Sequence, residues 1–224
     1  MEVRNISIPQ EIEKSNLLVK TYLLLTMGFL TMAGGTIIGL QFVPQMISLG
    51  KWGFLIVSLL VTIGTMFLAL LNQKNTLGYL FFLLFTFTIG FFDAPSIAVI
   101  FSSPALIEIF KQAFVITAVV TGSLTAYVFI TKKDFSFLGG FLFSGLIIVV
   151  VMAVIGLFWQ NRTLEFVMSG MGALVFSGYI LYDTSRLIYE KSTAVEIAIA
   201  LFLDIINLFW SIFNLLSILN SNED

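Results

Sequence analysis

Seven long apolar runs follow one another along the chain, separated by short polar connections. Each run is apolar over ~20 residues, the length that a helix needs to cross a bilayer, whereas barrel strands alternate over about 10 residues. We expect the third run to be interrupted at Asp93-Ala94-Pro95, because proline lacks a backbone donor and clashes with the preceding turn. The predicted membrane spans are residues 22–43, 53–71, 77–100, 109–130, 137–158, 164–188 and 195–219.

Composition supports an all-α membrane protein. Of 224 residues, 58% are hydrophobic and only 11% are charged, too few charges to cover a soluble domain. The net charge of −2 gives no indication of a nucleic-acid partner. We divide the chain into a polar cytoplasmic N-terminus, residues 1–20, and one seven-helix transmembrane domain, residues 21–224. The first apolar run is too long for a signal-peptide core, so we expect it to be retained.

Lysine and arginine in the connections predict the orientation, because basic residues concentrate on the cytoplasmic side. With seven spans, eight basic residues fall on one side and three on the other, which places the N-terminus in the cytoplasm and the C-terminus outside. Six spans plus a re-entrant segment remains an alternative, since an aspartate weakens the preference of the last run for lipid. The eight are Arg4, Lys14, Lys20, Lys74, Lys132, Lys133, Arg186 and Lys191, and the three are Lys51, Lys111 and Arg162.

Small residues at four-residue spacing predict where helices approach closely. We expect these positions to hold the bundle together without a further role. They are Gly35 and Gly39, then Ala118, Gly122 and Ala126, and then Ser169, Ala173 and Ser177.

Two aspartates, Asp183 and Asp204, lie inside the last two spans. An ionisable group within a membrane span is costly and marks a functional site by default. Counting from the cytoplasmic ends puts Asp183 roughly 7–8 Å deep and Asp204 roughly 12–14 Å deep, so the two carboxyls can meet. Two carboxylates in contact tend to share one proton. Protonated, the pair would clasp the two helices; deprotonated, it would repel itself or recruit a hard cation such as Ca²⁺ or Mg²⁺.

Further polar positions accompany this pair. Asn207, Ser211 and Asn214 share one helix face with Asp204, which suggests an ion path or, as the plainer reading, hydrogen bonding between helices. Asp93, two residues before Pro95, is a second candidate for the path, and it could equally cap a restarted helix or lie at the outer interface. Arg186, one turn after Asp183, is a candidate charge partner, although its place at the cytoplasmic end favours a role as a topology anchor.

Three segments of the second half carry a family likeness. Together they resemble the transmembrane Bax inhibitor motif family, also called the Bax inhibitor-1 family, in its bacterial members. The likeness extends from about residue 110 to the C-terminus and is weak over the earlier spans. The segments are Tyr182-Asp183-Thr184-Ser185 with Leu187-Ile188, the connection Thr131–Gly140, and the last span with Asp204, Asn207-Leu208-Phe209 and Leu215–Leu219.

The resemblance implies a seven-helix fold whose last helix is central in the bundle, and a pH-sensitive calcium leak. By position, Asp183 and Asp204 match the family's sensor and gate, and they would be the calcium ligands. Two departures stand out. Family members often have a Ser-Pro element where this chain has Asp93-Ala94-Pro95, and the second span contains no charged residue. Some bacterial relatives are linked instead to a membrane-anchored ATP-dependent protease.

An enzyme is not expected. The chain contains no Cys and no His, which excludes the common catalytic triads and the usual haem and zinc ligands. An intramembrane aspartyl protease would carry a Gly-rich element at its second aspartate, whereas Asp204 lies between Leu203 and Ile205. A retinal protein would need a lysine in the last span, which has none.

The function we predict is a pH-sensitive calcium or cation leak in the inner (plasma) membrane, with Ca²⁺ and protons as its ligands and no cofactor. The alternative is a non-transporting regulator that binds a membrane protease or another membrane partner. The sequence defines no oligomeric state.

Overall fold

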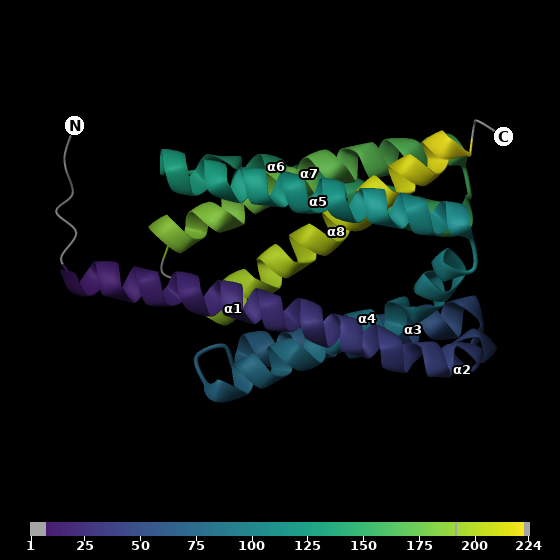
Figure 1. Ribbon diagram of the computed structural model, residues 1–224, viewed down its shortest axis with the longest axis horizontal. Coiled ribbons are helices and arrows are strands. Elements are labelled where there is room, and N and C mark those ends of the chain that lie inside the picture. Colours follow the sequence, from purple (N-terminus) through teal and green to yellow (C-terminus); the bar gives the residue numbers. More distant parts are fainter. Residues whose placement is uncertain (1–7, 191, 222–224) are drawn as a thin grey trace. The chain divides into compact units, whose positions relative to one another are not determined.

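The computed structural model describes residues 8–190 and 192–221. Over these residues it is 91% helical and contains no strand, and seven helices are long and apolar enough to span a membrane. This confirms the predicted number of spans. The helices are α1 (Ile8–Gly39), α2 (Val43–Ser48), α3 (Gly50–Leu71), α4 (Thr76–Phe101), α5 (Pro104–Thr131), α6 (Gly139–Phe158), α7 (Arg162–Tyr189) and α8 (Ala194–Asn220), with 3₁₀ turns at Leu40–Phe42 and Ser136–Leu138 (Figure 1).

The N-terminal helix α1 begins at Ile8, so it includes much of the segment predicted as a polar N-terminus. Residues 1–7 of that segment lie outside the described residues. The same holds for Arg4 and Lys191, two of the basic residues used to predict orientation. The short helix α2 continues the first span as far as Ser48.

The third span is not interrupted, so the prediction of a break at Asp93-Ala94-Pro95 is wrong. Helix α4 runs through Pro95 without a gap. Proline offers no N–H to the carbonyl of Phe91, four residues earlier. That carbonyl lies against Gly39 of α1, where an added Cβ would come within 2.5 Å of it. A neighbouring helix at such close range offers weak Cα–H···O contacts, which help the span to stay helical.

Two compact units make up the chain, and the boundaries between them fall inside α4, at the end of α7 and inside α8. One unit comprises the chain up to Ala98 together with Glu190–Ile199. In it, α1 and α4 pack with their backbones in contact. A Cβ on Gly35 or Gly90 would overlap a backbone carbonyl of the other helix, at Phe87 and Met32 respectively. The small-residue prediction is therefore confirmed at Gly35 and Gly39.

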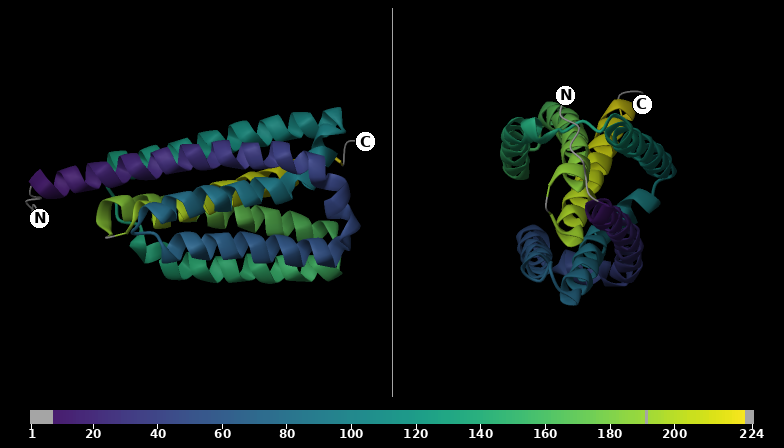
Figure 2. Two further views of the ribbon diagram at one scale, coloured as in Figure 1. Left: turned by 90° about the horizontal axis from the view of Figure 1, so that it is seen from below. Right: turned by 90° about the vertical axis from the view of Figure 1, so that its left-hand side faces the viewer.

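The other unit comprises Val99–Tyr189 and the chain from Ala200 onward. Here α7 packs against both α5 and α6 (Figure 2). Gly178 of α7 faces Leu142 of α6, and a Cβ there would meet that side chain at 2.5 Å. The ring of Phe110 on α5 packs 5.1 Å from that of Phe209 on α8. Gly122 of α5, by contrast, faces open space, so its predicted role in helix packing is wrong.

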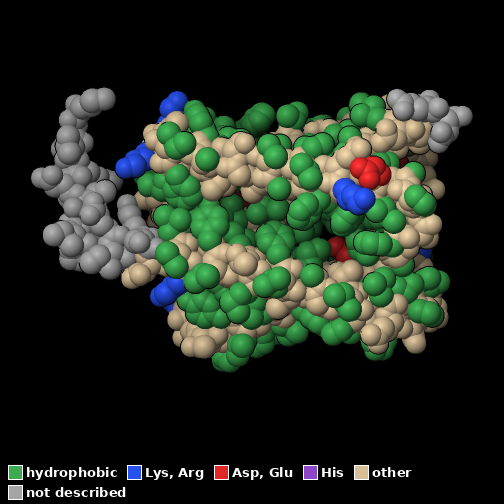
Figure 3. Space-filling model, in the orientation of Figure 1, with side chains coloured by type: hydrophobic (Ala, Val, Ile, Leu, Met, Phe, Trp, Pro, Cys, Tyr) green, Lys and Arg blue, Asp and Glu red, His purple; other side chains and the backbone are tan. Residues whose placement is uncertain are grey.

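Exposed apolar side chains cover the spans, as expected for helices that face lipid. Figure 3 shows hydrophobic side chains over most of the face that it presents, with few charged ones. Helix α8 is the exception, since 61% of its most apolar window is buried, against 6–33% for the other six spans. The last helix is thus the most enclosed, in keeping with the central position predicted for it.

Candidate functional site

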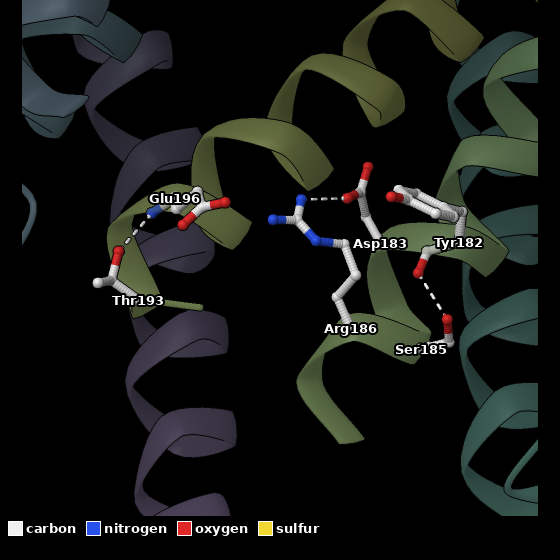
Figure 4. Close-up of polar contacts among 6 residues, drawn as sticks. All are labelled: Tyr182, Asp183, Ser185, Arg186, Thr193 and Glu196. Carbon is white, nitrogen blue, oxygen red and sulfur yellow. Dashed lines mark hydrogen bonds and ion pairs between the residues drawn. The ribbon is translucent and has the colours of Figure 1, made fainter. Parts of the chain in front are cut away.

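Helix α7 carries a buried ion pair three residues apart. Nη1 of Arg186 lies 2.8 Å from Oδ1 of Asp183, and the two side chains are 15% and 5% exposed (Figure 4). Spacing of three residues places both on one helix face. The structure therefore pairs Arg186 with Asp183, whereas the sequence favoured a topology anchor at this position.

Asp204 reaches the same place from α8. Its carboxyl interacts with Asp183 both through charge and through a side-chain hydrogen bond, and Arg186 also acts on it electrostatically. Asp204 is 6% exposed, and its Oδ2 has no hydrogen-bond partner in the part of the chain that the structure describes. The predicted meeting of two carboxyls between the last two helices is thus present. The reason is that α7 and α8 are consecutive, antiparallel spans joined by a short turn.

Two tyrosines adjoin this cluster, and sequence reasoning missed both. The guanidinium of Arg186 lies 6.0 Å from the ring centroid of Tyr182. The ring of Tyr179 packs edge-on to that of Tyr182 at 6.3 Å and interacts electrostatically with both aspartates. The available signal was spacing, because Tyr179 lies one turn before Asp183 on the same helix face.

The α5–α6 connection is attached to α7 next to the ion pair. Oγ of Ser185 donates to the carbonyl of Tyr182 at 2.7 Å and accepts the backbone N–H of Phe135 at 3.3 Å. The hydroxyl of Tyr189 donates to the carbonyl of Lys132. Asp134, in the same connection, is exposed and uses Oδ1 to accept the N–H of Ser136 at 2.9 Å. Family-like segments far apart in sequence therefore meet at one end of α7.

The polar face of α8 lines a cavity. Asn207, Ser211 and Asn214 border a space of about 320 Å³ between α6, α7 and α8. This is the placement expected for three of the four predicted path residues. Asp93 is partly buried on α4 in the other compact unit, so its part in a path stays a prediction.

The net charge of this site changes by one unit when the carboxyl pair gains or loses a proton. Asp183, Asp204 and Arg186 sum to zero when the two carboxyls hold one proton between them, and to −1 when they hold none. A Ca²⁺ ion takes six to eight oxygen ligands. Within the described residues, no group of three or more His, Cys, Asp and Glu side chains could hold a metal. The pair could therefore bind a cation only together with other oxygens.

Fold and site together define a multi-pass helical membrane protein with a buried carboxyl pair between its last two helices. Residues 14–222 match the family described as "Inhibitor of apoptosis-promoting Bax1". The chain therefore belongs to the Bax inhibitor-1 family, as the resemblance indicated.

Relatives occur in bacteria, animals and viruses. A membrane protein of Vibrio cholerae is 33% identical over 226 residues, covering 100% of this chain and 98% of its own length. Protein lifeguard 4 of Mus musculus is 37% identical over 168 residues, covering 74% of this chain and 69% of its own. The Golgi anti-apoptotic protein of Vaccinia virus is 43% identical over 116 residues, which is 51% of this chain and 49% of that protein.

Proposed function

We propose that this protein is a non-enzymatic, pH-sensitive cation leak, with Ca²⁺ as its main ion and the Asp183–Asp204 pair as its sensor and gate. The observation that carries the proposal is Asp204: a carboxyl 6% exposed, in contact with a second carboxyl, with one oxygen that lacks a partner in the described chain. A helix that only had to pack would not need such a group, since it is costly in a membrane.

The direction of the pH response follows from the charges. With one proton on the pair, the site is neutral and the hydrogen bond joins α7 to α8. Loss of that proton leaves two carboxylates facing one arginine, so the helices repel and the site attracts a cation. We therefore expect the leak to rise as pH rises, by up to about tenfold per pH unit for a single proton.

The proposed setting is the inner (plasma) membrane, with the N-terminus in the cytoplasm and the C-terminus outside. This orientation rests on the distribution of lysine and arginine in the sequence. It puts the aspartate pair near the cytoplasmic face, and the start of α7 and the end of α8 near the outer face.

Calcium flux into proteoliposomes at pH 6, 7 and 8 tests the proposal. Asp204→Asn mimics the protonated carboxyl permanently, so its flux is expected to stay at the wild-type pH 6 level throughout. Asp183→Asn is expected to lose the rise as well, because Arg186 can then neutralise Asp204. The matched control is Asp134→Asn, an exposed position where the amide keeps the acceptor oxygen used by Ser136.

Wild-type flux that ignores pH, or aspartate variants that behave like the control, would overturn the sensor role. Absence of flux together with co-purification of a membrane protease would favour the non-transporting regulator instead.

A further inference from the structure

Two adjoining cavities follow α8 from its C-terminal end toward Asp204. The outer one, of about 540 Å³, is bordered by Arg162, Glu165 and Ser217 among others. The inner one is the cavity of about 320 Å³ beside Asn207 and Ser211. Met168 and Asn214 line both. The two spaces therefore adjoin each other along α8.

Ser169 of α7 carries a buried hydroxyl on the wall of the inner cavity. It lines that cavity, is 3% exposed, and its Oγ has no hydrogen-bond partner within the described residues. Several other helical serines of this chain bond to their own helix, as Ser217 does to the carbonyl of Phe213 at 2.8 Å. A buried hydroxyl without any partner costs about 1–3 kcal/mol. A water molecule in the cavity, which takes up about 30 Å³, would satisfy this hydroxyl.

Most of the side chains that line the inner cavity are apolar, and its polar members besides Ser169 lie on α8. Ser211 is 9% exposed, and its Oγ lies where a Cβ on Gly172 would meet it at 2.5 Å. Asn207 donates its amide N–H to the carbonyl of Leu203 at 2.8 Å, which leaves its amide oxygen as the acceptor available to the cavity. Hydroxyl and amide oxygens form hydrogen bonds to the water molecules around a hydrated cation.

The inner end of this space stops short of the aspartate pair. Phe176 of α7 borders the inner cavity and is 8% exposed. Asp183 follows it by two helical turns, roughly 10 Å along the axis.

The outer end is crossed by Arg162, the first residue of α7. Its Nη2 donates to the carbonyl of Ile218 and to Oγ of Ser221, both at 2.6 Å, and so ties α7 to the last turn of α8. A guanidinium suits this place because the final carbonyls of a helix lack partners and carry negative potential. Glu165 is the one acidic residue among those that line the two cavities.

We propose that these cavities form one water-filled vestibule for a hydrated cation, which ends before the aspartate pair and is latched at its mouth by Arg162. The cation role rests on the leak proposed above. The water-filled vestibule itself does not.

Cysteine scanning tests the vestibule directly, because the natural chain contains no cysteine. Ser169→Cys and Asn214→Cys place a thiol in the inner and shared parts, and serine to cysteine is nearly isosteric. Leu174→Cys is the control, since Leu174 lies on the same helix as Ser169, is 76% exposed, and faces away from the cavities. A thiol in an apolar setting stays protonated and unreactive.

Each variant is reconstituted in liposomes and treated with a membrane-impermeant cationic methanethiosulfonate and with its anionic counterpart. We expect positions 169 and 214 to react at least about tenfold faster than position 174. The cationic reagent should react faster than the anionic one, after correction for intrinsic reactivity. Adding Arg162→Ala is expected to speed labelling at position 169 severalfold, while Arg162→Lys, which keeps the charge but not the paired geometry, should give an intermediate rate.

Calcium flux on the same liposomes separates the two proposals. Rapid labelling without flux would support the vestibule and overturn the leak. Flux with unreactive cysteines at positions 169 and 214 would overturn the vestibule and leave the leak standing. Faster labelling by the anionic reagent would overturn the cation preference, and unchanged labelling after loss of Arg162 would overturn the latch.

Discussion

Replacing Arg186 with glutamine is the sharpest test of the buried ion pair on α7. The arginine nitrogen lies 2.8 Å from Asp183, with 15% and 5% of the two side chains exposed. Without the cation, two carboxyls stay buried and lack a counter-charge. Breaking a buried pair in this way costs about 3–5 kcal/mol. Asp183→Asn is expected to cost less, because Asp204 remains to pair with the guanidinium.

Combining both changes should restore part of the lost stability. One buried carboxyl, that of Asp204, then lacks a counter-charge instead of two, and two amides can hydrogen-bond to each other. We expect the double variant to be more stable than the sum of the single changes by at least about 1.5 kcal/mol, the lower figure for a hydrogen bond to a charged group. At about 2–4 °C per kcal/mol for a chain of this size, Arg186→Gln should lower the melting temperature by roughly 6–20 °C.

Thermal unfolding in detergent, followed by the fluorescence of the three tryptophans, measures the stability of the two single variants and the double variant. The chain supplies its own control in Lys111 and Glu108, a pair with the same spacing, 3.3 Å apart but 65% and 60% exposed. Changing these two to glutamine should give a coupling below about 0.5 kcal/mol. If the effects of the two substitutions in the buried pair are additive, or if their coupling free energy is no larger than that of the exposed pair, the reasoning is refuted.

Two further changes test the packing around the site. Gly172→Ala places a Cβ 2.5 Å from Ser211, so it should cost about 1–3 kcal/mol in unfolding and slow cysteine labelling in the vestibule. Gly122→Ala, in open space, should be neutral or stabilising in the same measurements, and equal losses at both positions would contradict the close approach of α7 and α8. Ser185→Ala removes the acceptor for the N–H of Phe135, so hydrogen exchange at that amide should accelerate; unchanged exchange would mean that the connection is held elsewhere.

Hydropathy predicted the spans well because each is one apolar run of membrane length. The ends of α3, α7 and α8 agree with the predicted ranges to within three residues. The meeting of Asp183 and Asp204 could be predicted too, since it needs only depth along two consecutive helices.

Features set by packing between distant segments could not be predicted. Pro95 looked like a break, and only the approach of Gly39 from another helix shows how the span continues. Gly122 fits a packing motif yet faces open space, because four-residue spacing identifies a face but not its neighbour. The bond between Ser185 and Phe135 joins residues 50 positions apart, which no local pattern encodes.

The contact between Gly39 and the Phe91 carbonyl also bears on how the chain is made. A carbonyl without a hydrogen-bond donor is costly in hydrocarbon, so α4 alone is less stable in the bilayer than an uninterrupted helix. Helix α1 is synthesised before α4 and can already lie in the bilayer when α4 is inserted. Loss of α1 should therefore affect α4 during synthesis, before the helices that carry the aspartates exist. The proline of the third span makes biogenesis depend on the first.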